Sequence, residues 1–210
     1  VGKEIIISGA TQKKLSPEMI IASPSEVFYR VPLTLSGDSF SASFVPEEEG
    51  LYEIEINQED QIALFVASIS PEKEIPLLPD FFGVRKEAEL VPSDLQGKTL
   101  LDLVNAEKTA RGQEMVKEEE SLSQLAQFRA DDMCTRGYFG HQDPDQKYAS
   151  DYKSDFEIKR SIGENIAKDM NVFSAHAGLM RSLGHREFII SPGFSDVGFG
   201  FCRSEAQLIV

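Results

Sequence analysis

Residues 163–200 read GENIAKDMNVFSAHAGLMRSLGHREFIISPGFSDVGFG, and this stretch decides the fold expected for the second half of the chain. Three glycine-containing groups divide it: GENIA at 163–167, GHR at 184–186 and GFG at 198–200. Apolar residues at helical spacing predict a short helix over residues 172–182. Residues 194–202 and 206–210 are typical of two strands joined by a polar turn. This half of the chain is therefore expected to mix helices and strands.

Two longer helices are predicted upstream of that stretch. Leucine and valine residues share one side of a helix over about residues 96–111, and Gly112 is placed to end it in a left-handed conformation. A second helix runs from a capping box formed by Ser121 and Gln124 to Gly137. Both helices are thus bounded by local sequence signals.

Residues 1–70 are predicted to form an all-β domain of the immunoglobulin-like sandwich type. Apolar residues alternate with polar ones, as a strand with one solvent-facing side requires. The clearest sets are Phe40, Ala42 and Phe44, and Tyr52, Ile54 and Ile56. Turn-forming residues separate six or seven such short strands, and no helical period interrupts them.

A Pro-rich linker is expected over residues 71–93, because Pro71, Pro76 and Pro79 disfavour any regular element there. The second domain then covers residues 94–210. Each half is long enough to bury a core of its own.

The composition is that of an acidic globular protein, with 210 residues, 41% hydrophobic and 27% charged residues, and a net charge of −14. These values exclude disorder as the main state. Because no run of Lys or Arg offsets the acidity, we expect no nucleic-acid partner. The longest apolar stretch, Ile62 to Ile69, is far shorter than the roughly 18 to 20 residues of a transmembrane helix. The chain begins at Val1 in a strand-like segment, so we expect a processed protein whose targeting segment lies outside this sequence.

The three histidines, His141, His176 and His185, all fall in the second half of the chain. Histidine is the side chain that most readily exchanges protons or binds a metal near neutral pH. His141 and His185 follow predicted helix ends, where functional side chains commonly lie in loops. His176 is expected to be solvent-exposed or to cap a helix. No nucleophile is marked, because neither cysteine precedes a helix N-terminus beside a basic group and Ser182 has no elbow motif.

Six short motifs follow one another along the second half: Asn105-Ala106-Glu107 with Arg111-Gly112, Ala130 to Met133, GYFGH at 137–141, GENIA at 163–167, SLGHR at 182–186 and FSDVGFG at 194–200. In this order they resemble the CAP superfamily of cysteine-rich secretory proteins, antigen 5 and pathogenesis-related 1 proteins. They are most similar to its short bacterial SCP-like members. The resemblance covers about residues 94–210 and implies an α-β-α sandwich there. It also implies a secreted or surface-exposed protein.

The resemblance implies that His141, Glu164 and His185 converge on a central cavity. The family's second Glu has no counterpart, because Leu179 and Ser182 stand where its motif is expected. Two imidazoles and one carboxylate are the ligand set of catalytic zinc sites, which keep a fourth position for water. These three residues are therefore the candidate zinc ligands. As alternatives, Glu164 acts as a general base or fixes the imidazoles by hydrogen bonding.

The redox state of Cys134 and Cys202 is left open by the sequence. An extracellular location favours oxidation of an even number of cysteines. However, a cysteine inside a predicted helix and one in a strand with apolar neighbours are equally consistent with two buried thiols.

The leading functional hypothesis is a non-enzymatic extracellular binding module whose cavity holds a metal or a small ligand. Its expected partners are a small ligand, a lipid or a cell-surface component. One alternative is a hydrolase, peptidase-like in character, that uses His141, Glu164 and His185. The other is an adhesive or spacer protein that acts through the β-sandwich. The sequence predicts no oligomeric state.

Overall fold

The computed structural model describes residues 1–59, 63–70, 91–204 and 207–210. The chain divides into two compact units, one rich in strands and one rich in helices, which we treat separately. Most of the predicted linker, residues 71–90, lies outside the described residues. Within the described ranges, no helix is both long and apolar enough to cross a lipid bilayer.

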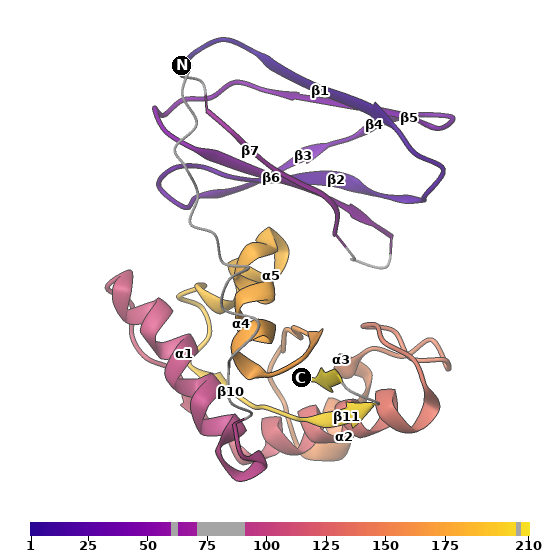
Figure 1. Cartoon of the computed structure of the whole chain (residues 1–210), viewed down its shortest axis with the longest axis vertical. Helices are drawn as coiled ribbons and strands as arrows, with labels where there is room; N and C mark the ends of the chain where they lie inside the picture. The colour runs from indigo at the N-terminus through magenta and orange to yellow at the C-terminus, as the bar shows by residue number, and fades with distance from the viewer. Residues whose placement is uncertain (60–62, 71–90, 205–206) are drawn as a thin grey trace. The chain divides into compact units, whose positions relative to one another are not determined.

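The N-terminal unit is built from two antiparallel sheets (Figure 1). Its strands are β1 (Ile5–Ala10), β2 (Leu15–Ala22), β3 (Phe28–Pro32), β4 (Thr34–Ser36), β5 (Ser39–Phe44), β6 (Tyr52–Gln58) and β7 (Ala63–Ile69). The smaller sheet has the strand order β1-β5-β4 and the larger one β3-β2-β6-β7. The prediction of a sheet-rich N-terminal region is therefore confirmed.

The core of this unit lies between its two sheets. Met19, Ile21 and Ile56 of the larger sheet are almost fully buried, and Ala42 of the smaller sheet belongs to the same cluster. The period-2 pattern predicted this burial for Ala42 and Ile56. It is wrong for Glu55, which was expected on the solvent-facing side and is fully buried. The immunoglobulin-like type is not confirmed, because β2 lies between β3 and β6, whereas the second strand of an immunoglobulin domain pairs with the first and fifth.

The C-terminal unit combines helices with short strand pairs (Figure 1). Its helices are α1 (Gln96–Ala110), α2 (Glu120–Arg136), α3 (Ala149–Tyr152), α4 (Val172–Arg181) and α5 (Leu183–Ile189), with 3-10 turns η2 (Ser93–Leu95) and η3 (Lys153–Phe156). Its strands are β8 (Lys117–Glu118), β9 (Lys168–Asp169), β10 (Asp196–Val197), β11 (Cys202–Ser204) and β12 (Gln207–Ile209). β8 pairs with β10 in parallel, and β11-β12-β9 is antiparallel.

The C-terminal ends predicted for the two long helices agree with the structure, whereas the predicted N-terminal capping box is absent. Gly112 and Gly137 both have left-handed backbones, with φ of 68° and 70°. Gly137 directly follows α2, and Gly112 follows Arg111, the C-cap of α1. The capping box at Ser121 and Gln124 is wrong, because α2 begins two residues earlier than it requires, with Glu119 as its N-cap and no side-chain cap. Ser121 instead donates a hydrogen bond to the Glu119 carboxylate.

Two further expectations need correction near the chain end. His185 does not lie in a loop, because residues 183–189 form the short helix α5 directly after α4. Residues 194–202 do not form one continuous strand. They contain β10 and the start of β11, and β11 pairs with β12 as the predicted hairpin.

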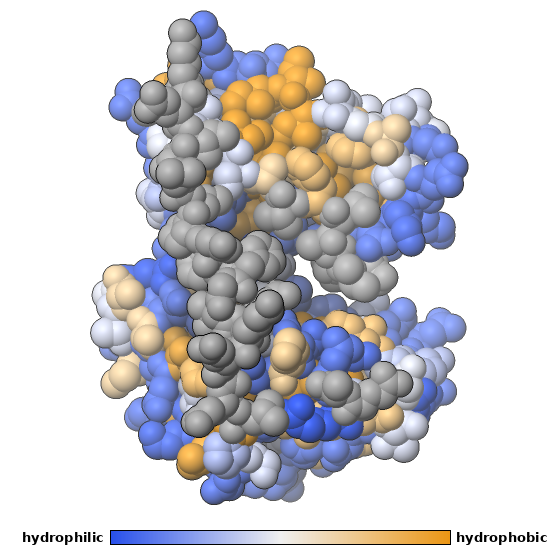
Figure 2. All heavy atoms as spheres, in the orientation of Figure 1, coloured by the Kyte–Doolittle hydropathy of each residue, from blue (hydrophilic) through white to orange (hydrophobic). Residues whose placement is uncertain are grey.

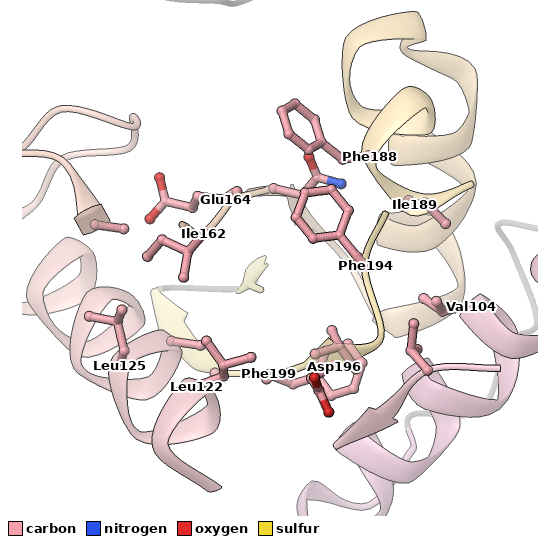
Figure 3. A pocket seen from close by; sticks show the side chains of 18 of the residues that line it. Val104, Leu122, Leu125, Ile162, Glu164, Phe188, Ile189, Phe194, Asp196 and Phe199 are labelled. Atoms are coloured by element: carbon pink, nitrogen blue, oxygen red, sulfur yellow. The ribbon is translucent and has the colours of Figure 1, made fainter. Parts of the chain in front are cut away.

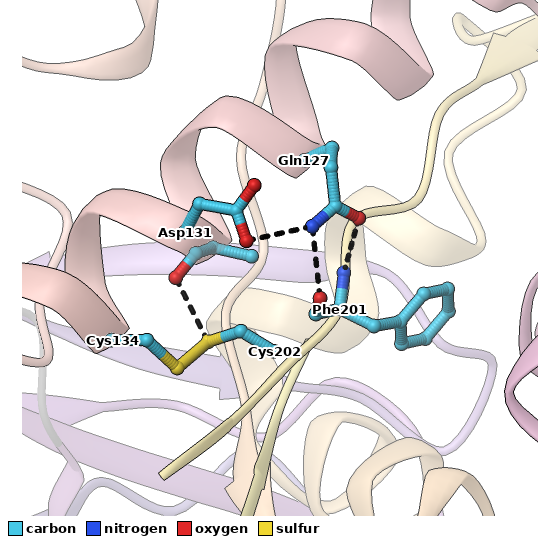
Figure 4. The surroundings of a disulfide bond; sticks show 6 residues. Gln127, Asp131, Cys134, Phe201 and Cys202 are labelled. Carbon is cyan, nitrogen blue, oxygen red and sulfur yellow. Dashed lines mark hydrogen bonds between the residues drawn. A yellow bond between two sulfur atoms is a disulfide. The ribbon is translucent and has the colours of Figure 1, made fainter.

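A disulfide and a side-chain amide fasten the segment before β11 to helix α2 (Figure 4). Cys134 is bonded to Cys202, which decides between the two alternatives that the sequence left open. The Gln127 amide accepts a hydrogen bond from the Phe201 N–H at 3.0 Å and donates one to its carbonyl at 2.9 Å. A Cβ at Gly200 would overlap with backbone atoms of α2, so glycine is required for this close approach.

Candidate functional site

The structure brings His141, Glu164 and His185 together. They come from the loop after α2, the loop before β9 and helix α5. The Nδ1 atom of His141 lies 2.8 Å from Oε2 of Glu164. The rings of His141 and His185 stack with centroids 6.1 Å apart and an interplanar angle of 25°. The three side chains therefore form one polar cluster, although none is near another in sequence.

Arg129 organises this cluster, and sequence reasoning missed it. Its side chain is 3% exposed, and its Nε donates to Oε1 of Glu164 at 3.1 Å. Its other guanidinium nitrogens donate to the Tyr138 hydroxyl and to the carbonyls of Gly140 and His141. Burial opposes its charge, but the neighbouring Glu164 and Tyr138 raise the pKa of Arg129 above its ordinary value. One arginine thus fixes both the carboxylate and the loop that carries His141.

A zinc ion does not fit this arrangement. Both oxygens of Glu164 are already engaged, one by the Arg129 guanidinium and the other by His141. A cation on Glu164 would also face the buried positive charge of Arg129. No group of three or more His, Cys, Asp or Glu side chains within the described part of the chain is arranged to hold a metal ion. The contacts agree better with the alternative in which Glu164 orients an imidazole by hydrogen bonding.

A cavity of about 470 Å³ lies beside the cluster, inside the C-terminal unit (Figure 3). Its lining is mostly apolar and comes from α1, α2, α4, α5 and the segments before β9 and around β10; Val104, Leu122, Leu125, Ile162, Phe194 and Phe199 are examples. Glu164 belongs to the lining, whereas His141 and His185 do not. The polar cluster therefore meets the cavity only through its carboxylate.

His176 is a lining residue of this cavity, so its predicted position at the surface or at a helix cap is wrong. It is 7% exposed in the middle of α4, and burial lowers its pKa below the ordinary value. Its Nε2 atom has no hydrogen-bond partner among the described residues. The signal that reveals it is spacing: it stands four residues after Val172 and three before Leu179, on the apolar face of the helix.

The same domain is found in known proteins. A model of the CAP family, the cysteine-rich secretory protein family, matches residues 101–209, more than half of the chain. The chain belongs to this family. The CAP unit occupies its C-terminal half, as the six motifs predicted, and the CAP fold of that unit is confirmed.

Bacterial proteins are among those similar to this CAP protein. The uncharacterised protein YkwD of Bacillus subtilis is 34% identical over 109 residues, which are 51% of this chain and 42% of YkwD. The chain thus corresponds to less than half the length of this relative. An outer surface protein from Borrelia burgdorferi has a TM-score of 0.52 at 11% identity, over 59% of this chain and 93% of that one. An extracellular protein containing an SCP domain from Bacillus anthracis has a TM-score of 0.49 at 17% identity, over 93% of this chain and 66% of that one.

Proposed function

We propose that this CAP protein is an extracellular binding module whose cavity holds a small, mostly apolar ligand. The cavity of about 470 Å³ carries this proposal. Small-molecule sites are concave, mostly apolar and about 300–1,000 Å³ in volume, with a few polar groups that fix the ligand's orientation. At about 30 Å³ per water-sized group, the cavity has room for a ligand of about 12 to 15 non-hydrogen atoms.

Two observations support the extracellular location. Cys134 and Cys202 are joined, and disulfides persist mainly in oxidising compartments outside the cytosol. A relative that shares the fold is named an outer surface protein. Both observations agree with a module that binds its ligand at the cell surface or outside the cell.

Titration of the full chain with 1-decanol, followed by calorimetry, tests this function. We expect saturable binding of one molecule per chain. Val104→Phe places a larger side chain in the lining and should weaken binding at least about tenfold. The matched control is Val45→Phe, since Val45 is 51% exposed in the N-terminal unit. No saturable binding, or equal weakening by both substitutions, would overturn the proposal.

The hydrolase alternative is favoured by one contact, the 2.8 Å approach of His141 Nδ1 to Glu164. A carboxylate on Nδ1 leaves Nε2 of an imidazole as a general base. Incubation with peptide and ester libraries is the test. Turnover that disappears in Glu164→Gln would establish this alternative, and absence of turnover by a folded wild type would remove it.

An adhesive or spacer role of the N-terminal unit, whether or not it is of the immunoglobulin-like type, is a third proposal. Figure 2 shows apolar side chains gathered on a face of this unit, and Ile6 and Leu35 are 69% and 50% exposed. Adhesion of the full chain to bacterial cells, compared with Ile6→Ser and Leu35→Ser, tests it. Unchanged adhesion by both variants would exclude these residues.

A further inference from the structure

One wall of the cavity is a chain segment outside any helix or strand. It lies between η3 and β9, and residues 160–166 all line the cavity. Figure 3 shows Ile162 of this segment beside the cavity. Arg160, Ser161 and Gly163 line the cavity and are also exposed to solvent. Along these residues, a single layer of chain therefore separates the cavity from solvent.

Backbone hydrogen bonds fix this segment only at its two ends. The Ile158 N–H donates to the Lys153 carbonyl, and Ala167 exchanges two hydrogen bonds with Val210. Between these ends, residues 159–166 make no backbone-to-backbone hydrogen bond with any described residue. Loops without such bonds open locally at a lower free-energy cost than helices and strands. The wall is therefore held mainly by its side chains.

Side chains of the polar cluster fix the half of the segment that is nearer to β9. Glu164 accepts a hydrogen bond from Arg129 at 3.1 Å and lies 2.8 Å from Nδ1 of His141. Asn165 donates from Nδ2 to the His185 carbonyl at 3.1 Å. Local opening is therefore confined to the part of the segment before Glu164.

Arg160 fastens that remaining part, residues 159–163. Its guanidinium pairs with carboxylates on two separate elements: Glu119, the N-cap of α2, and Asp196 of β10, the latter at 3.0 Å. Asp196 itself lines the cavity (Figure 3). A further contact, from Lys153 Nζ to the Arg160 carbonyl at 3.3 Å, lies at the surface. The Arg160 side chain is 47% exposed, so dissolved salt screens both of its ion pairs.

We propose that residues 159–163 form a strap that closes the cavity, and that the two ion pairs of Arg160 are the latch that holds the strap shut. This inference rests on the proposed function and adds a route by which the ligand enters and leaves. When the ion pairs break, the strap moves away from β10, while Ile158 and Glu164 keep its ends in place. Rising ionic strength therefore opens the cavity more often.

Hydrogen–deuterium exchange of the full chain, resolved by NMR at the amides of Ser161, Ile162 and Gly163, measures this opening. Raising NaCl from about 0.1 M to about 1 M shortens the screening length from about 10 Å to about 3 Å. We expect exchange at these amides to become about three- to tenfold faster in the wild type. Arg160→Met should give the faster rates at both salt concentrations. Asp196→Asn removes one of the two partners and should give intermediate rates.

Arg136→Met is the matched control, because this arginine also pairs with two carboxylates, Asp132 and Asp145, and lies outside the cavity lining. Its strap amides should exchange as in the wild type. Equal exchange rates in Arg160→Met and the wild type, or wild-type rates that do not depend on salt, would overturn the inference. If Arg160→Met does not fold, Asp196→Asn and the salt dependence of the wild type decide it.

The exchange of 1-decanol between its free and bound states, followed by NMR line shapes, tests whether the strap admits the ligand. A gate changes the association and dissociation rates by the same factor, whereas a contact with the ligand changes mainly the dissociation rate and the Kd. Arg160→Met should raise both rates about three- to tenfold and keep the Kd within about twofold. Unchanged rates, or a weaker Kd with an unchanged association rate, would overturn the gating role. Absence of 1-decanol binding would overturn the proposed function, and amide exchange would still decide whether the strap opens.

Discussion

Replacing Arg129 with methionine should destabilise the CAP unit by about 3–5 kcal/mol. The side chain is 3% exposed, and its guanidinium donates to the Glu164 carboxylate, a hydroxyl and two carbonyls. Methionine keeps much of the apolar stem but leaves Glu164, which is 18% exposed, without its counter-ion. Removal of one partner from a buried ion pair typically costs this amount.

Urea unfolding followed by circular dichroism at 222 nm measures the loss. The signal reports the CAP unit, because α1, α2, α3 and α4 and most of α5 belong to it and the N-terminal unit is otherwise built of strands in the described residues. Arg136→Met is the matched control on the same helix, where the arginine is 33% exposed and pairs with Asp132 and Asp145 at the surface. We expect a much smaller loss for this control.

A second variant isolates the charge pair. Arg129→Met combined with Glu164→Gln buries no unbalanced charge, so it should be more stable than Arg129→Met alone. If Arg129→Met is no less stable than Arg136→Met, or if the double substitution recovers nothing, Arg129 does not organise the site through Glu164.

Three further predictions concern a glycine, the disulfide and a buried histidine. In urea unfolding, Gly200→Ala should lower the unfolding free energy by at least about 3 kcal/mol, because the added Cβ would overlap with the backbone of α2. Gly178→Ala, in open space on α4, should instead raise it by about 0.5–1 kcal/mol. Similar effects of the two substitutions would contradict this prediction. Reduction of the Cys134–Cys202 disulfide should lower the unfolding free energy by about 4 kcal/mol, the value that chain entropy gives for this loop. Urea unfolding with and without dithiothreitol measures the loss, and an unchanged unfolding midpoint would contradict the prediction. Burial lowers the pKa of His176, so below about pH 6.5 the unfolded chain takes up a proton that the folded chain does not, and stability falls with falling pH by up to about 1.4 kcal/mol per unit. His176→Gln should remove this component from the measured pH dependence, and an identical slope in both proteins would refute it.

The sequence predicted those parts of the fold that local chemistry controls. Glycines with left-handed backbones, at 112 and 137, ended the two long helices, and alternation of polarity identified the strands of the N-terminal unit. Helix α5 was missed because it is short and has Gly184 as its second residue, and glycine disfavours helices. Two-residue strands such as β8 and β10 were missed because their pairing depends on tertiary contacts rather than on a period.

Only those site residues that belong to a family motif were predicted from the sequence. No helical or strand spacing relates His141, Glu164 and His185, so their convergence came from the family resemblance alone. Arg129 and His176 lie outside the quoted motifs, yet both occupy positions on the inward face of a helix. A charged or polar residue four positions from buried apolar neighbours on one helix face is the signal that points to them.

Nuclear Overhauser contacts between 1-decanol and the full chain test the central claim, that the CAP cavity binds a small, mostly apolar ligand, most directly. The account predicts contacts from the ligand's methylene protons to the methyl groups of Val104, Leu125 and Leu179, all of which line the cavity. It also predicts that these contacts disappear in Val104→Phe. Contacts confined to exposed residues such as Val45 and Ile6, or no contacts at saturating ligand, would contradict it.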